Sequence, residues 1–393
     1  MSLITFIVVG DRLGPSLFGL LAALLATIVL IGPLLTASPE HVAVQRIAQG
    51  TPVAQAWQRS VAILLTMGPV VAVAAVAASA IIAPAISVRA VVLITLGEVT
   101  LLGLARVAIR AHEAVGEAAV GTRVALVNLL SRGVVLGVFV FGAAPSIDTW
   151  SVLHVAASAA AAFHAHMTIP SGSSGWRFTL PTTDDYRLGL PFALNAGPDG
   201  LLSSNDRMVL SGVGLESDAG IYAAAYRIAS IANVPARSVL RTRYASYFKL
   251  ENQSTESSVK NALSIVRATA PAGVLSGLAL LLLAPVAQWV LGDDFADSVS
   301  ALRFLAFLPV VRSISTPGAN VLTGTGRQKL RILGTLGAAL LNLVLNLIFI
   351  PSYGWQAAVV TTLIAELALL VWIWFQVLRP GQTTAEMQSE LVD

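Results

Sequence analysis

Polar side chains interrupt the apolar stretch of the sequence that runs from Leu188 to Val213. Four of them follow one another at spacings of four, four and three residues: Asn195, Asp199, Ser203 and Asp206. These spacings place all four on one face of a helix. A charged side chain at the centre of a bilayer costs roughly 2.5–3.5 kcal/mol on insertion scales, so it is retained where it faces protein or water. The pattern predicts a membrane helix that lines a hydrophilic interior, with Asn195 among the residues that bind a ligand there.

Ionisable residues of both signs lie within the apolar stretches of the chain. Five are arginines: Arg132, Arg207, Arg227, Arg303 and Arg312. Four are acids: Glu98, Asp199, Asp206 and Glu366. The planar guanidinium group of arginine can bond phosphate oxygens through two parallel N–H donors. The slight excess of arginines therefore predicts an interior that binds an anionic ligand.

The positions of the arginines indicate which of them face this interior. Arg132 lies in the middle of a span, one helical turn after Asn128, and we expect it to face the interior. Arg303 and Arg312 are nine residues apart and point to opposite faces of a helix, so at most one of them faces the interior. The deeper Arg312 is the candidate.

Arg207 and Arg227 each leave two interpretations open. Arg207 follows Asp206 near the end of its helix, and this pair could contact a ligand or form a salt bridge to another helix. Arg227 follows Tyr226, which lies one turn after Tyr222. The two tyrosines share a helix face, so they could stack on sugar rings or pack within a bundle.

Carboxyl groups inside the membrane are candidates for ion coupling, because a buried carboxylate can hold a proton that an exposed one releases. The candidates are Glu98, Asp199 and Asp206. Asn342 and Asn346 lie one turn apart, and we expect them to form hydrogen bonds between helices.

Histidine spacing argues against a metal site. His164 and His166 point about 200° apart on a helix, so they cannot bind one metal from one face. We interpret them, and His154, as packing or interface residues. The sequence has no phosphate-cradling loop of a nucleotide-binding domain. No cofactor and no metal is expected, and energy for any transport would come from an ion gradient or from the cargo gradient.

Composition identifies the class of protein that holds these groups. Of its 393 residues, 56% are hydrophobic and 11% are charged, and the mean hydropathy is +0.78. Soluble domains have about 25% charged residues, so this is a membrane chain. The absence of cysteine excludes disulfides and thiolate metal sites. The N-terminus lacks a basic segment and a small-residue cleavage site, so no removable signal peptide is expected.

Apolar runs of about 20 residues, the length that spans a bilayer, recur along the chain. The first run, residues 1–9, is too short, and a turn at Gly10–Pro15 follows it. Spans of the first half are expected at Leu17–Thr36, Val61–Ile82, Val88–Ala108, Val124–Phe141 and Trp150–Ile169. Spans of the second half are expected at Leu188–Val213, Ala219–Leu240, Ala268–Leu291, Val299–Leu322, Ile332–Ile350 and Trp355–Leu378. A semi-polar connection, Glu40 to Arg59, separates the first two complete spans.

The predicted fold is therefore an all-α polytopic membrane protein with about 12 transmembrane helices in two six-helix bundles. A serine- and glycine-rich segment separates the halves. The expected parts are an N-terminal bundle (1–170), a cytoplasmic linker (171–187), a C-terminal bundle (188–378) and a cytoplasmic tail (379–393). An internal repeat supports two halves, because Gly19 matches Gly220 at an offset of 201 residues. With this offset the first helix lacks about a dozen residues of its partner, so it is expected to be truncated.

Basic residues mark the orientation in the membrane. If the N-terminus lies in the cytoplasm, only Arg12 and Arg89 lie at the outer side, in connections or at span ends, and five arginines lie deep within spans. All the others of the 24 basic residues lie on the cytoplasmic side. This asymmetry follows the positive-inside rule and predicts that both termini are cytoplasmic. It also accounts for the net charge of +3 without a nucleic-acid partner.

Four stretches resemble one known family in their order and spacing. They are GDRLGPSLFGLLAAL at 10–24, SSNDRMVLSGVGLESDAGIYAAAYRIASIANVPARSV at 203–239, LGDDFADSVSALRFLAF with LTGTGRQKLRI between 291 and 332, and Leu336–Gly354. The chain resembles the multidrug/oligosaccharidyl-lipid/polysaccharide (MOP) superfamily, specifically its polysaccharide-unit (Wzx-type) flippases. The short first helix departs from the family pattern.

The resemblance implies a V-shaped pair of bundles around a central cavity that opens alternately to each side. The implied cargo is an oligosaccharide linked to a polyprenyl pyrophosphate, moved across the bacterial cytoplasmic membrane for polysaccharide export. Implied partners are membrane lipid and a polysaccharide polymerase or glycosyltransferase. A wet groove with cationic groups suits this cargo, because its charged headgroup must cross about 30 Å of hydrocarbon.

Other functions remain open. A cation-coupled drug antiporter of the same superfamily would require a cavity dominated by acids. A membrane polysaccharide polymerase or ligase would require large outer loops, whereas those expected here are short, and we predict that the chain is not an enzyme. A non-transporting assembly partner is a third possibility.

Overall fold

The computed structural model of the chain describes residues 3–142, 144–170, 180–247 and 255–379. The helices of the first half are α1 (Leu3–Thr36), α2 (Pro39–Ala48), α3 (Val53–Ile82), α4 (Val88–Thr95), the π-helix η1 (Leu96–Leu101), α5 (Leu102–Ala114), α6 (Ala118–Phe141) and α7 (Ile147–Thr168). Those of the second half are α8 (Thr183–Gly212), α9 (Glu216–Ala232), α10 (Val234–Tyr247), α11 (Thr255–Leu291), the short 3₁₀ helix η3 (Asp293–Phe295), α12 (Asp297–Leu305), α13 (Phe307–Gly324) and α14 (Gln328–Leu378). The described residues contain no β-strand, which confirms the all-α prediction.

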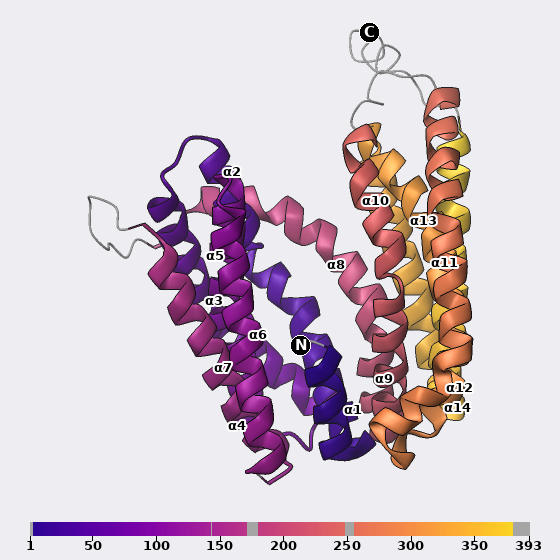
Figure 1. Cartoon of the computed structure of the whole chain (residues 1–393), viewed down its shortest axis with the longest axis horizontal. Coiled ribbons are helices and arrows are strands. Elements are labelled where there is room, and N and C mark those ends of the chain that lie inside the picture. The colour runs from indigo at the N-terminus through magenta and orange to yellow at the C-terminus, as the bar shows by residue number, and fades with distance from the viewer. Residues whose placement is uncertain (1–2, 143, 171–179, 248–254, 380–393) are drawn as a thin grey trace.

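Two of these helices contain a break at a glycine. Gly14 (φ 72°) divides α1, and Gly354 (φ 54°) divides α14. Both glycines hold positive φ angles, which side chains with a Cβ rarely adopt. The break in α1 leaves Leu3–Leu13 as a first helix of about 16 Å at 1.5 Å per residue, roughly half a bilayer. Figure 1 shows the start of α1 near mid-height between the two groups of helices.

Apolar length and surface both identify a multi-pass membrane protein. Among the described residues, seven continuous helical segments are long and apolar enough to cross a membrane, by length and composition. The last of these, Gln328–Leu378, contains the break at Gly354 and comprises two predicted spans. On α6 the large apolar side chains of Leu126, Leu130 and Val134 are exposed, as expected for a surface that meets lipid.

The helices form two groups that converge at one end and separate at the other (Figure 1). Helices α2 to α7 form one group and α9 to α14 the other, with α1 and α8 running between them. The converging end contains the break at Gly14, the α8–α9 connection and the break at Gly354. The most extensive packing between the halves is that of α1 on α9. The separated end, called the open end below, carries α2 and the far ends of α10 and α11.

Helix α8 starts at Thr183, within the segment expected as a linker, because Thr182 and Asp185 form a capping box. Asp185 is fully buried and binds Arg46 of α2 at 2.6 Å and Arg59 of α3 at 3.3 Å. Burial raises the pKa of this carboxyl group, but hydrogen bonds from Thr182 and Arg46 outweigh it and hold the pKa below its ordinary value. The start of α8 is thereby fixed to the first half of the chain.

Some expected boundaries differ from those of the structure. The connection Glu40 to Arg59 consists of α2 and the first turns of α3. The expected span Ala219–Leu240 is divided at Asn233 between α9 and α10, where Pro235 cannot continue the hydrogen-bond ladder of the preceding helix. Most of the linker and the tail, at 171–179 and 380–393, lie outside the described residues.

Candidate functional site

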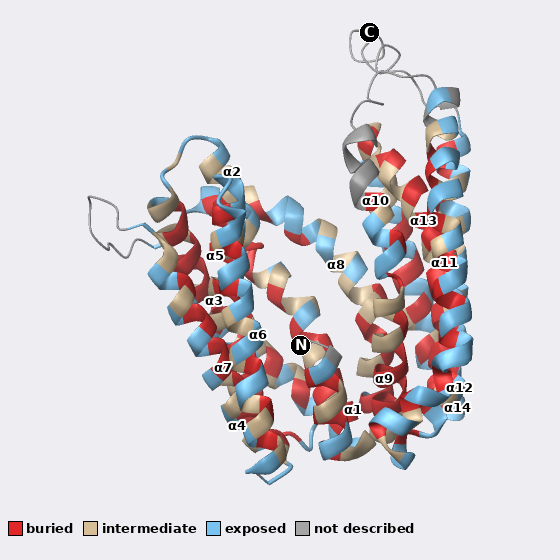
Figure 2. Ribbon diagram, viewed as in Figure 1, coloured by how far each residue is buried: buried red, intermediate tan, exposed pale blue. Residues whose placement is uncertain are grey.

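A cavity of about 720 Å³ lies between the two halves of the chain. Its walls come from α1, η1, α8, α9, α10, α13 and α14. Figure 2 shows that α8, between the two groups, carries mostly exposed and intermediate residues. Five arginines line the cavity: Arg207, Arg227, Arg237, Arg312 and Arg331. Three acids line it: Glu98, Asp199 and Glu366. The wall is therefore cationic in balance.

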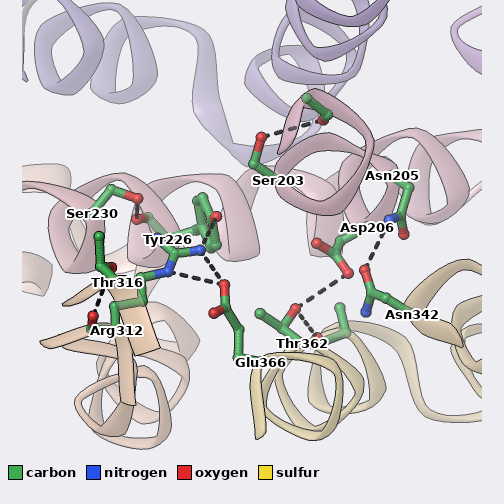
Figure 3. A network of polar contacts seen from close by, with 12 residues as sticks. Ser203, Asn205, Asp206, Tyr226, Ser230, Arg312, Thr316, Asn342, Thr362 and Glu366 are labelled. Atoms are coloured by element: carbon green, nitrogen blue, oxygen red, sulfur yellow. Dashed lines mark hydrogen bonds and ion pairs between the residues drawn. The ribbon is translucent and has the colours of Figure 1, made fainter. Parts of the chain in front are cut away.

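Arg312 is held in a buried ion pair on this wall. Its Nη2 atom lies 2.5 Å from Glu366 Oε1, and its Nε atom donates to the same oxygen at 2.9 Å. Nη2 also donates to the hydroxyl oxygen of Tyr226 at 3.0 Å (Figure 3). Arg312 therefore faces the cavity as the sequence indicated, but its charge is balanced by Glu366. The arrangement links α13 to α14 and orients Tyr226.

Two further arginines lie against aromatic rings. The guanidinium carbon of Arg207 lies 5.6 Å from the centre of the Tyr226 ring, and that of Arg227 lies 5.7 Å from the centre of the Phe6 ring. Stacking on a ring restricts the guanidinium plane, whose edges carry N–H donors in a fixed fork. This geometry suits recognition of phosphate oxygens in the cavity.

Asp199 and Ser203 are the part of the predicted polar stripe that lines the cavity. Arg331, Arg312 and Glu366 are the charged groups that act on Asp199 electrostatically. Asn195 does not line the cavity, although it shares the helix face with Asp199. Pro198 and the bend of α8 separate the two positions, so the stripe is not straight.

Asp206 lies outside the cavity, in a buried network between α8, α9 and α14. Its carboxylate accepts hydrogen bonds from the Tyr222 hydroxyl at 2.9 Å and the Asn346 amide at 2.7 Å. Thr362 donates a further bond at 3.3 Å. Asp206 and Tyr222 are both fully buried and neither lines the cavity, although Tyr222 was among the residues expected to bind a ligand there.

The same network confirms the asparagine prediction. Asn205 of α8 donates to Asn342 of α14 at 2.8 Å, and Asn346 donates to Asn205 at 2.5 Å (Figure 3 draws the first of these bonds). Carboxylate, amide and hydroxyl oxygens gathered in this way are of the type that hard cations bind. The described residues contain no group of three or more histidine or acidic side chains placed to hold a metal ion.

Arg132 also lies outside the central cavity, contrary to the sequence-based expectation. It lines a separate pocket of about 360 Å³ between α5 and α6. Its Nη2 atom lies 3.6 Å from Glu98 Oε1, and the same oxygen lies 3.5 Å from His154 Nε2. Glu98 lines both this pocket and the central cavity. Asp199, Arg227 and Arg312 share the central cavity, and Arg132 does not.

The positions of three residues near these sites were not predicted from the sequence. His154 was interpreted as packing, yet it lies buried beside Glu98. Arg237 and Arg331 were assigned to the cytoplasmic side, but α10 and α14 bring both into the cavity wall. The signal that could have found them is the position of Arg237 inside an expected span and of Arg331 directly before one.

No protein-family model and no curated protein sequence matches the chain. Solved structures with a similar fold exist. A multidrug resistance MATE family transporter of the MOP superfamily, in its inward-facing conformation, superposes with a TM-score of 0.77 at 14% identity, over 95% of this chain and 93% of that one. An outward-facing conformation of such a transporter gives a TM-score of 0.59 at 15% identity, over 95% and 94%.

A lipid flippase has the same fold. The lipid II flippase MurJ, in an inward closed conformation, superposes with a TM-score of 0.70 at 13% identity, over 95% of this chain and 86% of that one. The TM-score is higher for the inward-facing MATE structure than for the outward-facing one. These likenesses, together with the two groups of helices around a central cavity, show that the chain shares the fold of these transporter and flippase structures.

Proposed function

We propose that the protein is a flippase that moves a polyprenyl-linked oligosaccharide across the bacterial cytoplasmic membrane by alternating access, for export of a cell-surface polysaccharide. The observation that carries this proposal is the charge of the central cavity. Five arginines face three acids there, and one of the arginines, Arg312, is already paired with Glu366. A pyrophosphate group is the anionic part of such a cargo, and the arginine excess of the wall complements its charge.

An aromatic side chain in the cavity wall favours a cargo that carries a sugar. Tyr226 lines the cavity between Arg207 and Arg312, and its hydroxyl group is oriented by Arg312. In this conformation the ring is 7% exposed and lies against Tyr222, Arg207 and Arg312, so stacking on a sugar would require these side chains to move. We assign Arg207 and Arg227 to the pyrophosphate, and Tyr226 to the adjoining sugar.

The proposed orientation places both termini in the cytoplasm. The open end carries α2 and the adjoining ends of α10 and α11, and these helices contain Arg46, Arg241, Arg243, Lys260 and Arg267. The conformation is then open to the cytoplasm, where the cargo is loaded. We propose that the bundles 1–170 and 188–378 move relative to each other about the converging end, joined by the linker 171–187 and followed by a cytoplasmic tail.

Ion coupling is assigned to the acids that the helices enclose. Asp199 and Glu98 line the cavity, so they can exchange an ion or a proton with the open side. Asp206 is enclosed, so it would exchange only after α8 moves on α14. A polymerase or glycosyltransferase partner would supply or consume the cargo on either side of the membrane.

A cation-coupled drug antiporter is the second candidate function. The likeness to MATE transporters and the acids Glu98, Asp199 and Glu366 in the cavity favour it. The arginine excess argues against it, since a cationic drug would be repelled. The structural neighbours are described as transporters and a flippase, which favours transport over a polymerase or ligase.

The deciding experiment uses the purified protein in proteoliposomes. One set contains a fluorescent polyprenyl-pyrophosphate sugar in both leaflets, and flipping is measured by the fraction that a membrane-impermeant quencher reaches over time. A second set measures proton-driven export of a cationic dye. We expect flipping of the lipid-linked sugar and no dye export. Dye export without flipping would establish the antiporter instead. In cells, deletion should cause lipid-linked intermediates to accumulate on the cytoplasmic leaflet.

A further inference from the structure

We infer that the pocket between α5 and α6 is a second anion site, which takes the phosphodiester of an anionic membrane phospholipid. This pocket has a volume of about 360 Å³ and lies apart from the proposed cargo site, touching it only at Glu98. Its polar wall consists of Arg106, Arg132, Asn128 and Glu98. The rest of its wall is aliphatic, so one end is suited to a charged group and the other to hydrocarbon.

Arg132 supplies a buried donor that lacks an acceptor. The residue is 6% exposed, and its Nε atom donates to Asn128 Oδ1 at 3.2 Å. Its Nη2 atom is 3.6 Å from Glu98 Oε1, which is too long for a hydrogen bond. Its buried Nη1 atom finds no hydrogen-bond acceptor within the described part of the chain. Buried N–H groups are normally satisfied, so this guanidinium group is placed to bind an oxygen anion.

The π-helix η1 fixes the second arginine of the pocket. A π-turn is rare, occurs frequently at functional sites and changes which carbonyl groups the helix itself satisfies. Here the carbonyl oxygen of Glu98 accepts a hydrogen bond from Arg106 Nη2 at 3.2 Å, eight residues further along the chain. Arg106 thereby lies across the pocket from Asn128 and Arg132, and its remaining N–H groups extend the row of donors.

The charge of the pocket matches a single negative charge. Two arginines and one glutamate give the wall of the pocket a formal charge of +1. The glutamate, Glu98, lies 3.6 Å from the Nη2 atom of Arg132. His154, on α7, is the other titratable group beside Glu98. A phospholipid phosphodiester carries one negative charge, whereas the pyrophosphate of the proposed cargo carries two. The pocket therefore complements the phospholipid better than the cargo.

The surface beside the pocket is suited to an acyl chain. Leu129 lines the pocket and is 52% exposed, and its neighbours Leu126 and Leu130 on α6 are also exposed. An acyl chain that continues from the phosphate can lie along this apolar face, which meets the hydrocarbon of the bilayer. The pocket thus offers a polar end for the headgroup and an apolar exit toward the bilayer.

A bound phospholipid would act on the central cavity through Glu98. Its phosphate would compete with Glu98 for Arg132, and a freed Glu98 carboxylate would make the cavity less cationic. Binding of a phospholipid in the pocket would therefore change the affinity of the central cavity for an anion. The two ligands would not need to touch. Lipid composition would then regulate transport.

The test is lipid retention by the purified full-length protein, measured by native mass spectrometry with added dioleoyl phosphatidylglycerol or dioleoyl phosphatidylcholine. We expect the wild type to retain phosphatidylglycerol in preference to phosphatidylcholine. The double variant Arg106→Gln/Arg132→Gln should lose this preference by tenfold or more. Arg123→Gln is the matched control, because Arg123 is an exposed arginine on the same helix that does not line the pocket.

A second variant tests the site without altering its charges. Ala125 lines the pocket, and Ala125→Trp would fill it while both arginines stay in place. We expect this variant to lose phosphatidylglycerol as well, with an unchanged elution profile. Retention equal to the wild type in both variants would overturn the inference. Displacement of the lipid by inorganic phosphate at equal concentration, or tighter retention of polyprenyl pyrophosphate than of phosphatidylglycerol, would overturn it too. None of these measurements depends on transport. A failure of the flipping assay would therefore count against the proposed function and not against the phospholipid site.

Discussion

Gly19 on α1 and Gly220 on α9 lie against each other where these two helices cross. A Cβ atom added to Gly19 would overlap the carbonyl oxygen of Glu216, and one added to Gly220 would overlap the carbonyl oxygen of Pro15. Each carbonyl belongs to the residue four positions before the opposite glycine. The offset of 201 residues that relates the two glycines also relates Pro15 to Glu216. The contact is therefore symmetric and joins equivalent positions of the two halves at the converging end.

The first prediction concerns this crossing. Gly19→Val should force α1 and α9 apart, because overpacking a tight contact costs typically 1–3 kcal/mol. We expect flipping to fall about tenfold or more. The chain has no cysteine, so spin labels at Ser16→Cys on α1 and Ser217→Cys on α9 can report the separation directly. The label distance should increase.

Gly133→Val on α6 is the control for the glycine prediction, because a Cβ atom there meets nothing within 4 Å. It should flip cargo as the wild type does. Wild-type flipping and an unchanged label distance in Gly19→Val would show that the two helices need not approach this closely.

The second prediction concerns the pair Arg312 and Glu366. Removing one partner of a buried ion pair leaves an uncompensated charge and costs about 3–5 kcal/mol. Arg312→Glu should therefore abolish flipping, because it places two carboxylates together. The exchanged double variant Arg312→Glu/Glu366→Arg should recover stability in a thermal unfolding assay. Arg303→Glu, on an exposed arginine of α12, should have little effect. If the exchanged variant unfolds as early as Arg312→Glu, the pair does not act as a unit.

The third prediction separates two tyrosines that lie one turn apart. Tyr222→Phe removes a donor to the buried Asp206 and should destabilise the protein by about 1–3 kcal/mol, with little change in apparent cargo affinity. Tyr226→Ala removes a cavity wall and should raise the cargo concentration for half-maximal flipping about tenfold. Unfolding temperature and flipping rate against cargo concentration measure the two effects. The opposite pattern would move the cargo site to the buried network.

The fourth prediction is a pH dependence that arises from Asp185. Its pKa is held below the ordinary value, near 3.9 for an aspartate, so its stabilising contribution is complete above about pH 4. The contribution is lost as pH falls through the lower folded-state pKa. Asp185→Asn should lower the unfolding temperature at pH 7, and its difference from the wild type should shrink only below about pH 4.

Asp184→Asn is the matched control for the pH prediction, because Asp184 is the neighbouring aspartate and its side chain is 75% exposed. Its unfolding temperature should follow that of the wild type across the whole range. An Asp185→Asn protein as stable as the wild type at pH 7 would mean that the contacts with Arg46 and Arg59 contribute nothing to stability.

The sequence by itself determined the class of protein, the helices and the relation between the halves. Apolar runs of bilayer length can only form helices in lipid, because every backbone N–H and C=O group must be bonded within the segment. The repeat related Gly19 to Gly220 before their contact was seen. Asn342 and Asn346, one turn apart in an apolar helix, indicated hydrogen bonds between helices, since such amides need partners there.

Only the tertiary structure decided which polar groups share the cavity. Tyr222 and Tyr226 lie on one face of α9, yet α14 encloses the first and the second reaches the cavity. Arg132 had the depth expected of a cavity residue, but the packing of α5 on α6 placed it in a pocket of its own. Residue spacing fixes which side chains share a face of their own helix. What lies opposite that face depends on the rotation and crossing of neighbouring helices, which are set by contacts between residues far apart in the chain.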